Sequence, residues 1–198
     1  YYATNSHRDM FLKNLNIPDE YHHKAIRSGQ PHELIVDSLT QYQGTAKADT
    51  VMWPHRYNDD KQPGIAEDLS SDFAMVITQK MNLSKADYYA TMGTSKAIFS
   101  CALHENLGIS VMEAVLTGAI PIVPDRCSYT EMYLPEFKYP SEWTEVDQFD
   151  SHRDQLVEFI NTRLDNFADY QDLIKQQQQI LIKDYLSSST MINTLLGT

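Results

Sequence analysis

The sequence contains little glycine, and its glycines are far apart. The seven glycines stand at positions 29, 44, 64, 93, 108, 118 and 197. No two of them are closer than ten residues. A G-x-G-x-x-G dinucleotide loop and a Walker A phosphate loop both need closely spaced glycines, so both are excluded. Any phosphate group that the chain binds must be held in another way.

Cysteine, basic residues and long apolar runs are also scarce. The two cysteines, Cys101 and Cys127, form no C-x-x-C pair and have no pair of histidines near them, which argues against a disulfide framework or a zinc site and favours a reducing cytoplasm. The 16 Lys and Arg face 27 Asp and Glu, and the formal net charge of −11 argues against a general surface for nucleic acid or anionic membrane. No apolar run reaches the roughly 18–20 residues that a membrane-spanning helix needs.

The rest of the composition is that of a folded domain. The chain has 198 residues, of which 42% are hydrophobic and 22% charged, enough for a sizeable core. Short apolar runs of strand length alternate with helical patterns. The strands are predicted at 50–53, 73–78, 97–100 and 119–123, and the helices between them at 65–69, 84–92 and 109–117. This alternation predicts an α/β fold, a Rossmann-like parallel sheet flanked by helices.

The two ends of the chain have different patterns. Tyr1–Thr4 is predicted to be a short strand, followed by a helix cap at Asn5-Ser6 and a connecting segment with one short helix at 32–39. After residue 150 the chain is predicted to be helical. An apolar stripe and a second helix at 172–186, with the glutamine run on its solvated face, support this prediction; the stripe is Leu156, Ile160, Leu164 and Phe167.

These patterns divide the chain into three parts. Residues 1–48 are interpreted as the remnant of a preceding domain and a linker, residues 49–150 as the α/β domain, and residues 151–198 as a helical tail. We expect Tyr1–Leu15 to pack with the C-terminal helix, away from the sheet of residues 51–123, and to leave apolar surface exposed.

The most informative segment is His104–Ala114, which follows a predicted strand and enters a helix. Ligands of open α/β sheets bind at this carboxyl edge, and the free amides of a helix start favour an anion such as a diphosphate. Gly108 would let a ligand approach the backbone closely. Glu105 and Glu113, with seven residues between them, could accept hydrogen bonds from sugar hydroxyls.

Structural alternatives remain open for this segment. Ser110 and Glu113 have the spacing of a capping box, which would make Glu113 purely structural. His104 could form an acid–base pair with Glu105, contact a sugar, or make a structural hydrogen bond. Tyr129 and Glu131, further along, could line a pocket or brace the loop.

A second cluster follows the first predicted strand. Arg56 and Lys61 leave the same carboxyl edge, and two cations there complement a diphosphate. The alternative is that both are surface cations paired with Asp59 and Asp60. We do not favour these two aspartates as metal ligands, because no Asp-x-Asp site is present.

Together the clusters resemble the C-terminal, donor-binding half of retaining GT-B glycosyltransferases of the family-4-like type. That family carries an Arg and a Lys after the first strand of this domain, and two Glu separated by seven residues at a later strand–helix turn. The residues that match are Arg56, Lys61, Glu105 and Glu113. Gly118–Pro124 resembles the Gly-x-Pro strand that follows. Asp125–Glu131 resembles the Ser-Tyr-x-Glu variant of the next motif, which occurs in the branch that includes tRNA-queuosine mannosyltransferases and some phage enzymes. The resemblance thus extends over about residues 50–140.

The resemblance implies transfer of a hexose from a UDP- or GDP-sugar, with no metal or other cofactor required. It implies that Arg56 and Lys61 hold the diphosphate and, with Glu105, form the catalytic set. Glu105 would face the transferred sugar and Glu113 the ribose hydroxyls. The implied donor-binding set is Arg56, Lys61, His104, Glu105, Asn106, Leu107, Gly108, Ile109, Ser110 and Glu113. The acceptor stays open between a polysaccharide, a modified nucleobase in DNA or tRNA, and a small molecule.

The sequence also departs from that family. Fewer residues separate the second predicted strand from the Glu motif, and the N-terminal, acceptor-binding GT-B domain is missing, so we expect this chain alone to be inactive in transfer. One rival hypothesis is a non-catalytic sugar-nucleotide-binding or scaffolding domain of the same fold, which would not need all four charged residues. Another, a phosphorylase-like enzyme with pyridoxal phosphate, has no supporting motif.

Overall fold

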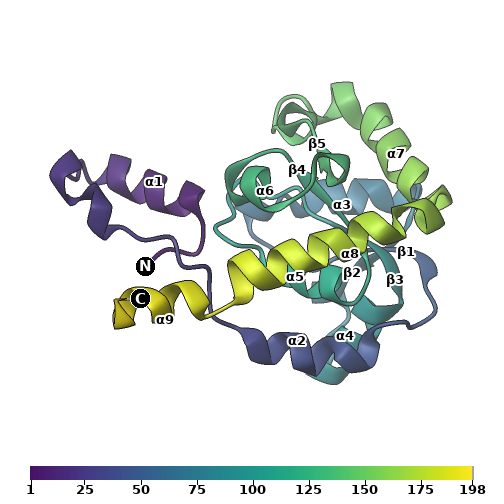
Figure 1. The fold of residues 1–198 in the computed structure, drawn as a ribbon. Helices are drawn as coiled ribbons and strands as arrows, with labels where there is room; N and C mark the ends of the chain where they lie inside the picture. Colours follow the sequence, from purple (N-terminus) through teal and green to yellow (C-terminus); the bar gives the residue numbers. More distant parts are fainter. Residues whose placement is uncertain (198) are drawn as a thin grey trace.

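The computed structural model describes residues 1–197, and its centre is a five-stranded, wholly parallel sheet (Figure 1). The strands are β1 (Ala48–Trp53), β2 (Ala74–Ile77), β3 (Ser95–Phe99), β4 (Ile120–Pro124) and β5 (Lys138–Tyr139), in the order β2-β1-β3-β4-β5. The predicted Rossmann-like α/β fold is confirmed. The sequence missed β5, because its two residues are too few to give an alternating pattern; they pair with Val123 and Pro124 at the end of β4.

Helices cover both faces of the sheet. They are α2 (Glu33–Leu39), α3 (Pro63–Asp68), α4 (Lys85–Thr94), α5 (Ile109–Leu116), α6 (Cys127–Met132), α7 (Phe149–Asp165) and α8 (Gln171–Ile180), with α1 (Asn5–Asn14) and α9 (Ser189–Leu196) at the ends. One core joins Met52 and Ile98 to α2, α4 and α5, and the other joins Val51 and Phe99 to α3 and α7. Neighbouring residues of β1 thus enter opposite cores, as the pleat of a strand requires.

The helical tail is present, with two differences from the prediction. The second helix ends as α8 at Ile180 and continues as a π-helix over Leu181–Leu186. The glutamine run is only partly solvated, because Gln177 is fully buried and its side chain bonds the backbone of Met132 and Leu134. A buried amide is tolerated here because both of its polar atoms have partners.

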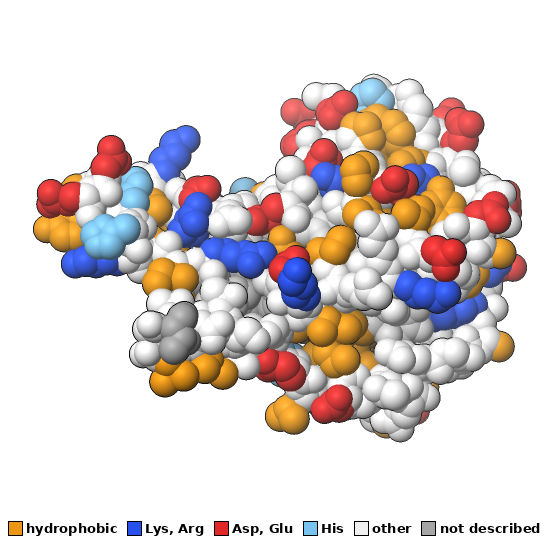
Figure 2. All heavy atoms as spheres, viewed as in Figure 1, with side chains coloured by type: hydrophobic (Ala, Val, Ile, Leu, Met, Phe, Trp, Pro, Cys, Tyr) orange, Lys and Arg blue, Asp and Glu red, His pale blue; other side chains and the backbone are white. Residues whose placement is uncertain are grey.

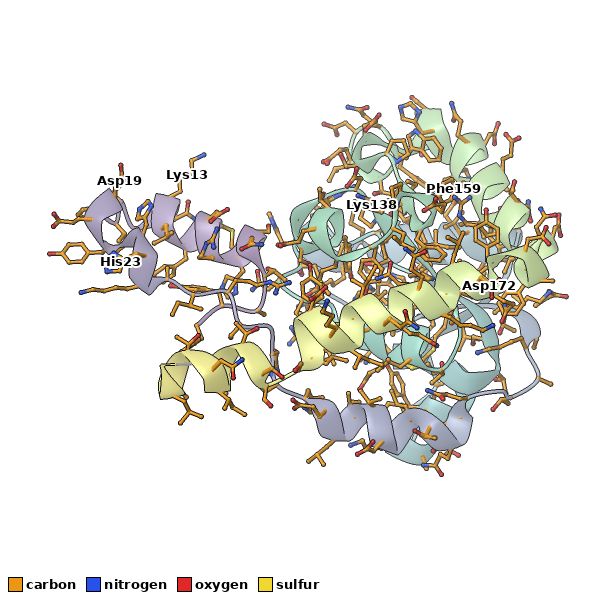
Figure 3. All side chains as sticks on the ribbon, viewed as in Figure 1. Lys13, Asp19, His23, Lys138, Phe159 and Asp172 are labelled. Atoms are coloured by element: carbon orange, nitrogen blue, oxygen red, sulfur yellow. The ribbon has the colours of Figure 1, made fainter. Side chains whose placement is uncertain are left out.

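The N-terminal segment stands out from the sheet (Figure 1). Tyr1–Thr4 is not a strand, since only Tyr2 forms an isolated bridge, with Arg27. Thr4, rather than Asn5-Ser6, caps α1, and its hydroxyl accepts from the amide of His7. In Figure 3 the side chains of Lys13, Asp19 and His23 point outward from this segment.

The predicted partner of this segment was wrong. Helix α1 packs mainly against α6 rather than against the C-terminal helix, because Glu131 of α6 binds the start of α1. The chain after α8 instead meets the turn at Gly29, where the amide of Gln30 donates to the carbonyl of Tyr185 at 2.7 Å. The segment lies outside the sheet, as predicted.

Apolar side chains are exposed on both terminal helices. On α9, Leu195 and Leu196 are 68% and 70% exposed. Figure 2 shows hydrophobic atoms on the surface in the region of α9, at the lower left. On α1, Met10 and Phe11 are also exposed. The expectation of exposed apolar surface is therefore confirmed.

Glu131 braces the structure, which settles one of the alternatives left open by the sequence. Its carboxylate accepts from the amides of Asn5 and Ser6, at 3.1 and 2.7 Å, and from the side-chain amide of Asn5 at 3.0 Å. Tyr129 is fully buried and its hydroxyl bonds the hydroxyl of Ser100. Neither residue lines the cleft described below.

We expect Glu131→Ala to loosen the N-terminal segment. The change removes three hydrogen bonds and a negative charge at a helix start, and lost caps cost about 0.5–2 kcal/mol. Urea unfolding should show a loss of that size, and limited proteolysis should cut residues 1–27 faster. Glu142→Ala is the control, because Glu142 is exposed and its side chain makes no hydrogen bond or ion pair within residues 1–197. Equal stability of the two variants would contradict the conclusion that Glu131 stabilises the N-terminal segment.

Candidate functional site

A cleft of about 480 Å³ opens beyond the carboxyl ends of β1 and β3. Its lining is Pro54, His55, Arg56, Lys61, Glu105, Asn106, Leu107, Gly108, Ile109, Ser110 and Glu113. The structure therefore brings together every residue of the implied donor-binding set except His104. The two clusters meet because parallel strands end at the same edge of a sheet and β1 is hydrogen-bonded to β3.

Lys61 joins the two clusters. Its side chain is 11% exposed, and its ammonium group lies 3.3 Å from a carboxylate oxygen of Glu105 and 3.1 Å from one of Asp60. It also donates to the main-chain carbonyl of His104. For Lys61 the alternative holds in part: its ion pair with Asp60 is present, but Lys61 is buried rather than at the surface and also contributes to the cleft lining. His104 has an exposed side chain and takes part only through this carbonyl.

Arg56 has a different environment. Its side chain is exposed at the cleft, and within residues 1–197 it forms no ion pair and no side-chain hydrogen bond. The proposed surface pair with Asp59 is therefore absent among the described residues. A guanidinium group in this position has its fork of donors available for an anion.

Glu105 organises its own loop. One carboxylate oxygen accepts from the amides of Asn106 and Leu107, at 3.1 and 3.4 Å, and the other pairs with Lys61. The carboxylate thus closes the loop just before α5. The amides of Ile109 and Ser110, in the first turn of α5, have no acceptor within that helix, as at any helix start. Free amides of this kind can bind an anion, and both residues belong to the cleft lining.

Glu113 is not a capping residue. Helix α5 is capped at Gly108, so Ser110 already lies inside the helix, and no side-chain cap bond forms. Glu113 is 8% exposed, and its carboxylate accepts from the hydroxyl of Tyr89 at 2.8 Å. Burial raises the pKa of Glu113, and the bond from Tyr89 acts against that rise. The capping-box alternative is therefore wrong.

Two side chains that contribute to this site, one in the cleft lining and one behind it, have little or no signal in the sequence. His55 is 5% exposed and packs edge-on against Trp53, and burial lowers the pKa of its imidazole to about 4, so it is neutral at pH 7. The only signal was its place next to Arg56 at the end of a strand. Tyr89 had no signal, because its contact with Glu113 depends on how α4 packs against α5.

Other residues considered from the sequence lie outside the cleft. Cys101 is fully buried, and burial raises the pKa of its thiol to about 12, which fits a small packing residue. Within residues 1–197 no cluster of three or more His, Cys, Asp and Glu has the arrangement of a metal site. No described helix combines the length and apolar character needed to cross a membrane.

A parallel α/β domain with cations and free helix amides at its carboxyl edge can bind an anionic ligand there. No protein-family model matches the chain. The chain is similar to the tRNA-queuosine alpha-mannosyltransferase of Drosophila melanogaster, with 27% identity over 119 residues; the match covers 45% of this chain and 32% of that protein.

Two solved structures share the fold. The structure of Anabaena HepE in complex with UDP and glucose matches with a TM-score of 0.66 and 15% identity, covering 100% of this chain and 62% of that one. The structure of TarM matches with a TM-score of 0.58 and 11% identity, covering 87% of this chain and 37% of that one. The chain thus spans about a third of the Drosophila protein and less than two thirds of either solved chain.

Proposed function

We propose that this chain is the donor-binding half of a retaining GT-B glycosyltransferase, which transfers a hexose from a nucleotide diphosphate sugar. The observation that carries the proposal is one cleft that contains an arginine without a partner in residues 1–197, the first-turn amides of α5 and a buried carboxylate. The names of the relatives support it: one is a mannosyltransferase, and another was solved with UDP and glucose.

Each group has a role in this proposal. Arg56 and the amides at Ile109 and Ser110 bind the diphosphate, which becomes the leaving group and gains charge as the glycosidic bond breaks. Lys61 adds positive charge and holds Glu105, whose loop faces the transferred sugar. Glu113 accepts from the ribose hydroxyls, because a carboxylate is a strong acceptor for such donors.

The acceptor site belongs to a second domain in this proposal. The chain covers only part of each relative, and apolar side chains of α1 and α9 are exposed, such as Phe11 and Leu195. A domain that docks there would close the cleft and exclude water from the reaction. The isolated chain should therefore bind a donor without transferring its sugar. The rival, a binding domain without transfer, predicts the same donor affinity but no gain of activity when the second domain is supplied.

Donor binding tests the proposal through Arg56. Calorimetric titration with UDP, GDP, UDP-glucose and GDP-mannose should identify one binding nucleotide. Arg56→Ala should then weaken binding by about 1.5–3 kcal/mol, because bonds to charged groups are worth that much. The melting temperature should not change, since Arg56 is exposed and makes no ion pair within residues 1–197.

Lys183→Ala is the matched control. Lys183 is exposed, lies outside the cleft and makes no hydrogen bond or ion pair through its side chain within residues 1–197. The change therefore removes one positive charge from the chain without touching the site, and affinity should stay as in the wild type. Absence of binding by every nucleotide would reject the proposal, and an unchanged affinity of Arg56→Ala would reject the assigned diphosphate site.

A further inference from the structure

The carboxylate of Glu113 is buried with a single hydrogen-bond donor. Within residues 1–197, only the hydroxyl of Tyr89 bonds it, through one of its two oxygens, and no Lys or Arg forms an ion pair with it. A buried carboxylate normally has charged partners or several donors, because burial penalises the charged form. The protonation state of Glu113 therefore depends strongly on this one hydroxyl.

The groups that face Glu113 come from two places in the fold. Helix α4 contributes Tyr89, Tyr88 and Lys85, and the turn before α2 contributes His32. Burial raises the pKa of Glu113, while Tyr89, His32 and Lys85 act in the opposite direction, with Tyr89 the strongest of the three. Tyr88 lies close to Glu113 but makes no hydrogen bond to it.

Tyr89 is suited to act as a permanent donor. Burial and the neighbouring Glu113 raise the pKa of its phenol, so its proton stays in place throughout the neutral range. Its ring is fixed by contacts with Tyr42 and Tyr88, whose ring centroids lie 6.0 and 5.5 Å away. A fixed, neutral donor directs one oxygen of Glu113 and leaves the other without a protein partner among the described residues.

We propose that Tyr89 is a positioning residue that keeps Glu113 ionised and leaves its second oxygen available to the ribose hydroxyls of a bound nucleotide. This inference rests on the proposed function. It assigns to the segment between β2 and β3 a part in donor binding, although no residue of that segment lines the cleft.

Tyr89→Phe tests the inference through the pH dependence of binding. The change removes the hydroxyl and keeps the ring, so the pKa of Glu113 should rise further. Because protonated Glu113 is a poorer acceptor, affinity for the nucleotide should fall as pH is lowered. Over about pH 5.5–8.5 the variant should lose about five- to tenfold in affinity at the acid end, and much less at the alkaline end.

The wild type and Tyr88→Phe provide the comparison. Tyr88→Phe removes a neighbouring hydroxyl that does not bond Glu113, so its binding profile should follow that of the wild type. The probes are UDP, its 2′-deoxy analogue and inorganic pyrophosphate, or the guanine equivalents if GDP is the better ligand. The pH-dependent loss should be present with UDP, smaller with the deoxy analogue and absent with pyrophosphate.

A double variant covers the case in which Tyr89→Phe is too unstable to measure. Glu113→Gln removes the titrating side chain, so Tyr89→Phe combined with Glu113→Gln should fold and should match Glu113→Gln alone in affinity at every pH. A lower affinity of the double variant would mean that Tyr89 acts without Glu113 and would overturn the inference.

The outcomes separate the inference from the proposed function. If the wild type binds no nucleotide, the proposed function fails. If the wild type binds and Tyr89→Phe has the same pH profile, the inference fails and the proposed function stands. A loss of affinity that is uniform over pH would also overturn the inference, because it is the result of a structural defect alone.

Discussion

Lys61→Ala should lower the free energy of unfolding by about 2–4 kcal/mol, more than any other single change to a charged residue of the cleft. The change leaves the carboxylates of Asp60 and Glu105 without their cation and the carbonyl of His104 without its donor. Removing one partner of a fully buried pair costs about 3–5 kcal/mol, and we expect less here because Asp60 is partly solvated. Urea unfolding measures the effect.

Two further variants separate charge from packing. Lys61→Met keeps the apolar stem and should remain strongly destabilised, since the charge is the part that matters. Combining Lys61→Met with Glu105→Gln removes the cation together with one of its carboxylates and should recover part of the loss, because replacing both partners is far less costly than replacing one. Wild-type stability of Lys61→Met would contradict the proposed link between the two loops.

Nucleotide binding should fall as well, but for a different reason than in Arg56→Ala. Without Lys61, the negative charges of Glu105 in the cleft lining and of Asp60 behind it lose their cation and repel a diphosphate, so affinity should recover in part when salt is raised. Arg56→Ala removes an attraction instead, and its residual affinity should weaken further with salt. Opposite salt dependences of the two variants would distinguish a structural cation from a ligand-binding one.

The sequence was sufficient to predict four of the five strands and the edge of the sheet at which the cleft lies. Strands such as Thr50–Trp53 and Ala97–Ser100 are apolar runs of the right length, and parallel strands end at one edge. Arg56 and Glu105 follow two of these strands directly. Their meeting follows from topology alone, without any knowledge of side-chain packing.

What the sequence could not supply depends on contacts between distant elements. The bond of Tyr89 to Glu113 joins residues 24 positions apart on two helices, and that of Glu131 to Ser6 joins residues 125 apart. No local pattern distinguishes these side chains from their neighbours. The capping-box interpretation of Ser110 failed for a local reason instead: the left-handed backbone of Gly108 starts the helix two residues earlier, so Ser110 is not at the cap.

Gly108→Ala should be the most destabilising change in the loop before α5. The residue has φ +71, where a side chain costs about 1–2 kcal/mol. An added Cβ would also lie 2.7 Å from the ring carbon Cε1 of Tyr129 and 3.0 Å from its hydroxyl. That ring is fully buried and bonded to Ser100, so it cannot move aside freely, and overpacking of this kind costs about 1–3 kcal/mol. We expect a total loss of about 2–5 kcal/mol.

The other glycines provide a graded set of controls for this clash. Gly44 has φ +73 and no atom within 4 Å of an added Cβ, so Gly44→Ala reports backbone strain alone. Gly64, in α3, has neither a positive φ nor a close neighbour, and Gly64→Ala should leave stability unchanged or raise it by up to about 1 kcal/mol. The loss in Gly108→Ala minus that in Gly44→Ala then measures the contact with Tyr129. Because the same loop carries the amides of Ile109 and Ser110, nucleotide affinity should fall only in the Gly108 variant. Equal losses in the free energy of unfolding for Gly108→Ala and Gly44→Ala would show that the ring of Tyr129 moves to make room for the added Cβ. In that case the ring does not hold the loop in place.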